Sequence, residues 1–165
     1  MSNRKIVTAE IARSVAQACL CLHVQRAARA LARHFDDVLR PLDLTSGQYS
    51  LLMSLNRPKG VAGPTITDTA RFLAMDRTTL TAALKPLERR GLVAVKADKE
   101  DRRARRLELT AAGRAVLAKA YPMWYAAHGA LEAAVSSSGA GPMRGELNRM
   151  VQWLERRGTE EGAEG

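Results

Sequence analysis

Hydroxyl and cationic side chains share one face of the segment from residue 77 to residue 89. If this segment is a helix, each residue turns by about 100°, so Leu80, Leu84 and Leu87 gather on the opposite face. Threonine is short enough to let a helix approach base edges, and Lys or Arg can bind guanine or phosphate. The candidate DNA contacts are Arg77, Thr78, Thr79, Thr81, Lys85 and Arg89. The alternative is an ordinary amphipathic helix with a solvated polar face.

A second concentration of charge follows at residues 96–106. Cations crowd in or beside the expected loop 97–104, namely Lys96, Lys99, Arg102, Arg103, Arg105 and Arg106. Arginines at a hairpin tip suit a narrow, electronegative minor groove. Asp98, Glu100 and Asp101 would repel phosphate there, so we expect them to pair with neighbouring arginines and fix their direction. The alternative is a solvated run of charge.

The elements that would position these residues are predicted from periodicity and capping residues. Apolar residues spaced by three and four predict one long helix over residues 8–39, and Pro41 marks its end. Capping residues mark the starts of three shorter helices. They are Thr45 with Gln48, Thr65 with Asp68, and Asp76 alone. The remaining expected elements are strands over 92–96 and 105–109 and helices over 110–135 and 143–157.

This order of elements predicts the fold class. It is mainly α with a small β-wing: a winged helix-turn-helix core flanked by N- and C-terminal dimerisation helices. Residues 1–44 form an N-terminal helix that contributes to dimerisation, and residues 45–110 form the DNA-binding lobe. Residues 111–157 form the C-terminal dimerisation helices, and residues 158–165 form a disordered tail. The terminal helices are assigned to a dimer interface because they are too apolar to stand alone.

Charge and composition favour a polyanionic partner. The 165 residues carry a formal net charge of +9, and most of the cations are arginine, which binds phosphate and guanine bidentately. We recognise no signal peptide, membrane span or metal-ligand spacing, so we expect a cytoplasmic protein without membrane contact, metal or cofactor. We also recognise no nucleophile elbow and no phosphate-binding glycine loop, and expect that the protein is not an enzyme.

Three stretches resemble the MarR (multiple-antibiotic-resistance regulator) family. They are MDRTTLTAALKPLERRGLV at residues 75–93, DRRARRLELTAAGR at residues 101–114 and LRPLDLTSGQYSLL at residues 39–52. The resemblance implies that Arg103 is the minor-groove arginine and that Asp101 orients it. The wing contacts are then Asp101, Arg102, Arg103 and Arg105. The resemblance also implies a homodimeric transcriptional regulator, in most members a repressor, on a palindromic operator with half-sites about one helical turn apart.

Two signals compete as the cause of DNA release. One is a small aromatic ligand, bound where the dimer helices meet the DNA-binding lobe, as the resemblance implies. A polar or basic handle among aromatic side chains suits an aromatic carboxylate. The candidate lining residues are His23, Arg26, Tyr49, Met53 and Trp124. The alternative role for these side chains is packing in the core or in the dimer interface.

The other signal is oxidation of Cys21. By resemblance, Cys21 lies where the organic-peroxide sensors of the family carry their reactive cysteine, which must ionise to react. Those sensors hold the thiol with three tyrosines, whereas the corresponding residues here are Gln25, Phe35 and Ser46. The alternative for Cys21 is a small buried core residue. A non-specific architectural DNA-binding protein is a further alternative to a sequence-specific regulator.

Overall fold

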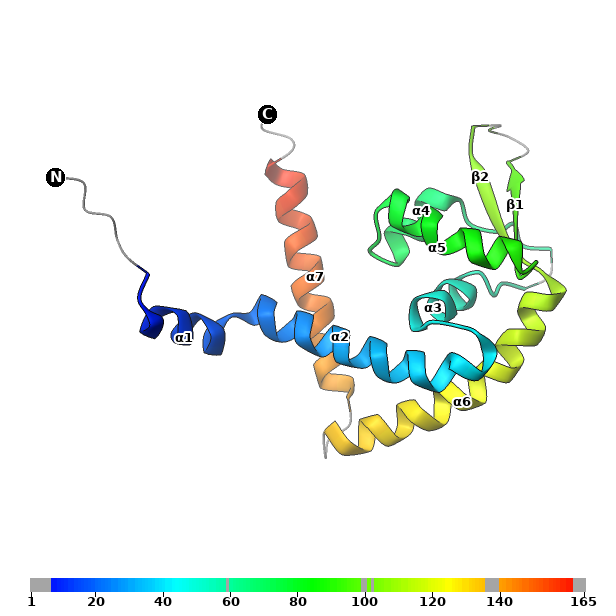
Figure 1. The fold of residues 1–165 in the computed structure, drawn as a ribbon. Helices are drawn as coiled ribbons and strands as arrows, with labels where there is room; N and C mark the ends of the chain where they lie inside the picture. Colours follow the sequence, from blue (N-terminus) through cyan, green and yellow to red (C-terminus); the bar gives the residue numbers. More distant parts are fainter. Residues whose placement is uncertain (1–6, 59, 99–100, 102, 136–139, 162–165) are drawn as a thin grey trace. The chain divides into compact units, whose positions relative to one another are not determined.

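The chain is mostly helical. The computed structural model describes residues 7–58, 60–98, 101, 103–135 and 140–161 (Figure 1). In chain order the elements are α1 (Ala9–Ala18), α2 (Leu20–Leu39), the 3-10 helix η1 (Arg40–Leu42), α3 (Ser46–Ser54), α4 (Ile66–Phe72), α5 (Arg77–Arg89), β1 (Val93–Ala97), β2 (Arg105–Leu109), α6 (Ala111–Val135) and α7 (Gly141–Glu161). The chain divides into two compact units, Met1–Tyr121 and Pro122–Gly165. None of the helices in the described ranges is both long and apolar enough to cross a membrane. The expected helical fold with a small β-wing is confirmed.

The expected single helix over residues 8–39 is wrong, because the chain breaks at Cys19. Cys19 has φ −71° and ψ 101°, an extended conformation that separates α1 from α2. Its Sγ accepts a hydrogen bond from the backbone N–H of Leu22 at 3.4 Å and so caps α2. The apolar spacing behind the prediction begins only at Leu20, and α1 buries none of its residues. Packing therefore does not force the two segments into one helical register.

The expected N-terminal caps of α3, α4 and α5 are confirmed. Thr45 and Gln48 form a reciprocal capping box on α3, and Thr65 and Asp68 form another on α4. At α5 the side chain of Asp76 accepts a backbone N–H of the first turn. Such caps satisfy N–H groups that the start of a helix leaves unpaired. The local sequence therefore determines where these three helices begin.

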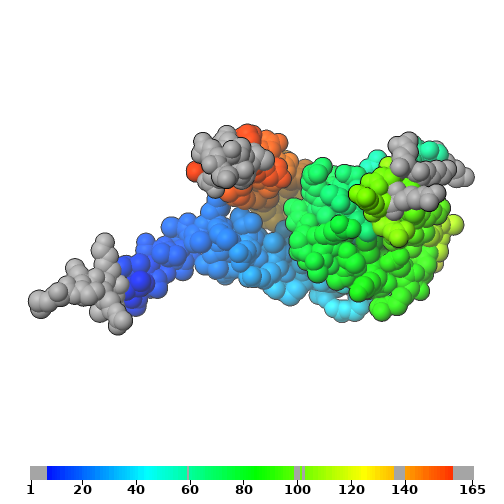
Figure 2. All heavy atoms as spheres, turned by 90° about the horizontal axis from the view of Figure 1, so that it is seen from above, coloured from blue at the N-terminus to red at the C-terminus, as the bar shows by residue number. Residues whose placement is uncertain are grey.

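A leucine-rich core underlies α5 and the hairpin in the first unit. Its fully buried members come from α2, α3, α5 and β2, and are Leu39, Leu51, Leu52, Leu80, Leu84, Leu87 and Leu107. Burying one leucine contributes about 1.5–3 kcal/mol relative to an exposed one. The three leucines of α5 are those that the sequence placed on its inner face, so the predicted orientation of this helix is confirmed. Figure 2 shows the residues around α4 and α5, in green, gathered into one compact mass.

The strands β1 and β2 form an antiparallel hairpin. Val93 pairs with Leu109, so β1 begins at Val93 rather than at the expected residue 92. Leu107 and Leu109 lie on the same face of β2, two residues apart, and both are buried. The strand β2 also meets the chain before α4, where the N–H of Leu107 donates to the carbonyl of Pro64 at 2.9 Å. A Cβ at Gly63 would overlap the carbonyl oxygen of Leu107, so this close approach requires glycine.

In the second unit, α7 continues beyond its expected end at residue 157, to Glu161. The expected disordered tail is therefore wrong for residues 158–161, while residues 162–165 lie outside the described residues. No proline interrupts the helix there, and a glycine such as Gly158 costs a helix only about 1 kcal/mol. Within this unit Arg144 of α7 pairs with Glu132 of α6. The hydrogen bond from Arg144 is the main cause that lowers the pKa of Glu132.

Apolar side chains are exposed on both α1 and α7. Ile11 and Val15 expose 49% and 56% of their surface, and Leu147 and Val151 expose 40% and 45%. The α7 residues recur at a spacing of four, which places them on one face of the helix. Exposed apolar residues gathered on one helix face are candidates for an interface with another molecule.

Candidate nucleic-acid interface

One carboxylate organises the N-terminus of α5. Asp76 accepts the N–H of Thr79 at 2.8 Å through Oδ1 and its hydroxyl at 2.5 Å through Oδ2. The hydroxyl bond and then the N–H bond of Thr79 lower the pKa of Asp76 below its ordinary value of 3.8. Thr79 was expected among the DNA contacts, but its hydroxyl is engaged in the cap. Thr79 is also absent from the residues that line the depression on the exposed face of this helix.

The other expected contact residues come together on the exposed face of α5. A shallow depression of about 350 Å³ is lined by Arg77, Thr78, Thr81, Ala82 and Lys85. The hydroxyl of Thr81 donates to the carbonyl of Arg77 at 2.7 Å. Arg89 is exposed at the end of the same helix. Short side chains with cations on either side suit a helix that lies in the major groove.

The wing loop is organised around Asp98, which is only 5% exposed. Asp98 Oδ1 accepts the N–H of Asp101 at 3.0 Å, and the N–H of Asp98 donates to the carbonyl of Ala104, also at 3.0 Å. Asp101 Oδ1 accepts the backbone N–H of Arg103 at 2.9 Å. The expected link between Asp101 and Arg103 is thus present through the backbone of Arg103. It fixes the turn from which the exposed Arg103 side chain projects.

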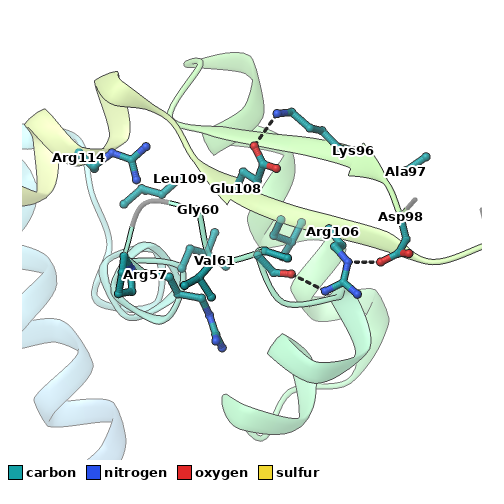
Figure 3. A pocket seen from close by; sticks show the side chains of 15 residues that line it. Arg57, Gly60, Val61, Lys96, Ala97, Asp98, Arg106, Glu108, Leu109 and Arg114 are labelled. Atoms are coloured by element: carbon teal, nitrogen blue, oxygen red, sulfur yellow. Dashed lines mark hydrogen bonds and ion pairs between the residues drawn. The ribbon is translucent and has the colours of Figure 1, made fainter. Parts of the chain in front are cut away.

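Arg106 turns inward and pairs with Asp98. Its Nε donates to Asp98 Oδ2, and its Nη1 donates to the carbonyl of Gly63 at 2.9 Å (Figure 3). The expectation that a wing carboxylate directs a neighbouring arginine is met by this pair. Sequence reasoning placed Arg106 among the cations in or beside the wing loop, outside the predicted DNA contacts, and did not identify which carboxylate it pairs with. The available signal was strand alternation, which puts Arg105 and Arg106 on opposite faces of β2.

The other wing cations differ in their surroundings. Arg105 is exposed at the start of β2, opposite Ala97. Lys96 forms an exposed ion pair with Glu108 at 2.6 Å. Arg102, an expected wing contact, lies outside the described residues, as do Lys99 and Glu100. Arg103 and Arg105 are therefore the expected arginine contacts that the structure describes.

The candidate ligand-pocket residues have very different surroundings. Tyr49 is buried in α3, and its burial, followed by the nearby Tyr121, raises its pKa. Met53 and Arg26 are exposed, and a ring nitrogen of His23 lies 3.1 Å from the carbonyl oxygen of Gln17. Trp124 belongs to the second unit, where its ring lies 4.6 Å from that of His128. A hollow of about 600 Å³ between the wing and the loop before α4 is lined by other residues (Figure 3).

Both cysteines are free thiols with different surroundings. Cys21 is exposed, so the alternative of a buried core residue is wrong for the chain by itself. Its Sγ accepts a hydrogen bond from Gln25 Nε2 at 3.1 Å. Gln25 and Phe35 stand at two of the three positions where the peroxide sensors of the family carry tyrosines. Phe35 is buried in the core. Among the described residues, His, Cys, Asp and Glu form no cluster that could hold a metal ion.

Comparison with known proteins identifies the family. A family model described as MarR family matches residues 44–104, which include α3, α4, α5 and β1. The M. tuberculosis transcriptional regulator MosR, solved in complex with DNA, is 36% identical with a TM-score of 0.74. That alignment covers 84% of this chain and 97% of MosR. The chain belongs to the MarR family.

Two other relatives of this MarR-family chain have names that describe opposite effects on transcription, repression and activation. The transcriptional repressor CouR, solved on a 23-mer DNA duplex, is 28% identical, with a TM-score of 0.65. That alignment covers 86% of this chain and 95% of CouR. The transcriptional activatory protein BadR of Rhodopseudomonas palustris is 41% identical over 73 residues, which are 44% of this chain and only 42% of BadR. The chain thus matches less than half the length of this curated relative.

Proposed function

We propose that this MarR-family chain is a sequence-specific transcriptional regulator that binds double-stranded DNA. The observation that carries the proposal is one lobe that presents both the exposed face of α5 and a carboxylate-organised wing. The face of α5 suits the major groove, and Arg103 suits the narrow minor groove beside it. MosR and CouR, at 36% and 28% identity, were each solved with DNA, which supports the same role.

The regulator acts as a homodimer on a near-palindromic operator. The exposed apolar residues of α1 and α7 support this assembly, since a second copy would cover them. A two-fold dimer places its two α5 helices in successive major grooves, with half-sites about 10–10.5 base pairs apart. We assign repression, as in the name of CouR, and the name of BadR makes activation the alternative.

A binding titration against competitor DNA tests the proposal. The first duplex to use is the promoter upstream of the protein's own gene, with bulk genomic DNA as competitor. A sequence-specific regulator prefers its operator by about 10³-fold or more, and its log affinity falls steeply with log salt. Nearly equal affinity for operator and bulk DNA would support the architectural alternative instead. Inserting about five base pairs between half-sites turns one half-site to the opposite side of the duplex and should abolish tight binding.

A small aromatic carboxylate is the proposed releasing signal. The proposed lining residues are those expected from the sequence, namely His23, Arg26, Tyr49, Met53 and Trp124. The chain holds two tryptophans, so Trp153→Phe leaves Trp124 as the only tryptophan reporter. Titration with benzoate should then change the Trp124 fluorescence and release operator DNA over the same concentration range. A fluorescence change without DNA release would disconnect this pocket from regulation.

Oxidation of Cys21 is the second candidate signal. Its thiol is exposed and accepts a hydrogen bond from Gln25, so it is open to a peroxide. Cumene hydroperoxide should release the operator from the wild-type protein and not from the Cys21→Ser variant. Cys19→Ser is the matched control, because Cys19 is half-buried and its Sγ caps α2. Equal release from wild type and Cys21→Ser would exclude Cys21 as the sensor.

A further inference from the structure

An ion pair between the buried Asp98 and the part-buried Arg106 ties the wing to the chain before α4. Arg106 Nε donates to Asp98 Oδ2 and Arg106 Nη1 donates to the carbonyl of Gly63, which joins three separate parts of the lobe. We propose that Arg106 is a positioning residue that sets the wing against the helix-turn-helix without touching DNA. We name Asp98, Arg106 and the carbonyl of Gly63 the wing latch. The inference rests on the proposed DNA-binding function.

Asp98 depends on Arg106 because of its burial. The Asp98 side chain is only 4% exposed, whereas that of Arg106 is 35% exposed. A carboxylate this far from water needs a cation or several donors, since an unpaired buried charge is strongly unfavourable. Arg106 supplies the cation, and the N–H of Asp101 supplies a further donor. Losing Arg106 would therefore remove this ion pair from a buried carboxylate.

The latch also constrains the wing tip, because each carboxylate oxygen of Asp98 accepts a different hydrogen bond. While Oδ2 holds Arg106, Oδ1 holds the N–H of Asp101, and Asp101 holds the N–H of Arg103. Three consecutive hydrogen-bonded links thus connect Arg106 with the turn that carries Arg103. A change in the latch should therefore alter the direction from which Arg103 approaches the minor groove.

At its other end the latch is joined to the start of α4. Thr65, the N-cap of α4, forms an isolated antiparallel bridge with Arg106, and Leu107 bonds the carbonyl of Pro64. The close approach of Gly63 to Leu107 lets these contacts form side by side. The latch therefore joins the wing to the first helix of the helix-turn-helix at one place.

Arg106 differs from a direct phosphate contact in two ways. Its Nε and Nη1 are already engaged, and its charge is balanced by Asp98 at the same site. Strand alternation places it on the face of β2 opposite Arg105, the exposed arginine next to it. The two neighbouring arginines thus provide a contact residue and a positioning residue for comparison.

Asp98→Asn tests the latch through the sign of its effect on operator binding. If Asp98 acts only as a negative charge near phosphates, its neutralisation should tighten DNA binding. If Asp98 positions the wing, Asn removes the carboxylate charge that holds Arg106, and operator affinity should fall by about tenfold. Tighter binding by Asp98→Asn would overturn the proposal.

Hydrogen exchange of the wing amides gives a readout that needs no DNA. In Asp98→Asn and Arg106→Gln, the amides of Asp101 and Leu107 should exchange about tenfold faster or more. Lys96→Gln is the matched control, since it removes one charge from the same hairpin but breaks an exposed pair with side chains 60% and 43% exposed. Arg105→Gln should weaken operator binding while leaving wing exchange unchanged.

The outcomes distinguish this proposal from the proposed function. Unchanged wing exchange in Asp98→Asn and Arg106→Gln overturns the latch even if both variants bind DNA weakly. Faster exchange in a protein that never binds an operator supports the latch as a structural device and contradicts the proposed function. If Arg106→Gln does not fold, Arg106→Lys replaces it, because lysine retains the charge but lacks the planar fork that reaches Asp98 and Gly63 together.

Discussion

At the residue scale, the arginines of the wing differ in their exposure and in their hydrogen-bond partners. Arg103 is exposed at a turn that Asp101 fixes, whereas Arg106 is held inward by the buried Asp98. The threonines of α5 also differ: the hydroxyl of Thr79 donates to the capping Asp76, whereas that of Thr81 donates to the carbonyl of Arg77 on the face that lines the depression. Residue type therefore predicts the chemistry available to a side chain, and its hydrogen-bond partners decide how it is used.

Arg103→Ala should weaken operator binding without unfolding the protein. Arg103 is exposed and lies outside the core. As the proposed minor-groove contact, its loss should cost about 1–3 kcal/mol of binding free energy. A band-shift titration at fixed salt measures the loss, and the helical circular dichroism signal should stay unchanged. Lys119→Ala is the control, because it removes one exposed charge from α6, away from the wing in sequence. Equal affinities for Arg103→Ala and wild type would remove Arg103 from the interface.

Sequence alone could place Arg103 but could not find the wing latch. The family pattern around Arg103 is local, so a resemblance over a few residues is sufficient. The latch joins Gly63, Asp98 and Arg106, and Gly63 approaches β2 only after the loop before α4 has folded back. Burial of Asp98 is also a tertiary property, which local charge patterns do not encode. The pairing of Arg106 with Asp98 and Gly63 is therefore visible only in the folded structure.

At the element scale, the boundaries best predicted are those set by short-range hydrogen bonds. The caps at Thr45, Thr65 and Asp76 act over three residues, so the sequence contains all that determines them. The break at Cys19 was missed because cysteine is an unusual N-cap and the segment before it has good helical periodicity of its own. The end of α7 was missed because a charged, glycine-containing segment was taken as disorder, although its residues allow a helix.

The capping carboxylates should make the DNA-binding lobe sensitive to acid. Hydrogen bonds from Thr65 lower the pKa of Asp68, and those from Thr79 lower the pKa of Asp76, each from an ordinary value of 3.8. A lowered pKa in the folded state means that stability is full above 3.8 and is lost as pH falls through the folded value. Thermal unfolding between pH 7 and pH 2 should therefore show stability falling below about pH 4.

A pair of substitutions at one cap separates its charge from its hydrogen bond. Asp76→Ala should lower Tm at neutral pH by a few °C, since it leaves N–H groups of α5 without a partner. Asp76→Ser retains an acceptor that does not ionise, so it should recover much of that Tm and reduce the slope below about pH 4. An unchanged acid slope in Asp76→Ser would assign the acid sensitivity to other carboxylates.

At the scale of the whole molecule, strong positive charge and uncovered apolar helices occur in one chain. The net charge of +9 attracts DNA without regard to sequence, so specificity must come from where the contacts are held. In the proposed dimer, two lobes held at a fixed spacing would provide that, because only a correctly spaced pair of half-sites would engage both lobes. The exposed apolar residues of α1 and α7 are the surfaces that could hold two copies together.

Placing charges on α7 should therefore separate the dimer and weaken operator binding together. Leu147→Glu combined with Val151→Glu puts two carboxylates on the exposed apolar face of α7, where burial against a partner would be strongly unfavourable. Sedimentation equilibrium should then give the mass of one chain, 18.0 kDa, instead of twice that value. Operator affinity should fall because the second lobe no longer binds as part of the same molecule.

The matched control places the same charge on an exposed apolar residue outside the terminal helices. Val61 is 52% exposed in the loop before α4, so Val61→Glu should leave the dimer mass unchanged. A dimeric mass for the α7 variant would move the interface to another surface. A monomer that keeps full operator affinity would contradict the two-lobe account of specificity, since one lobe would then be sufficient to recognise the site.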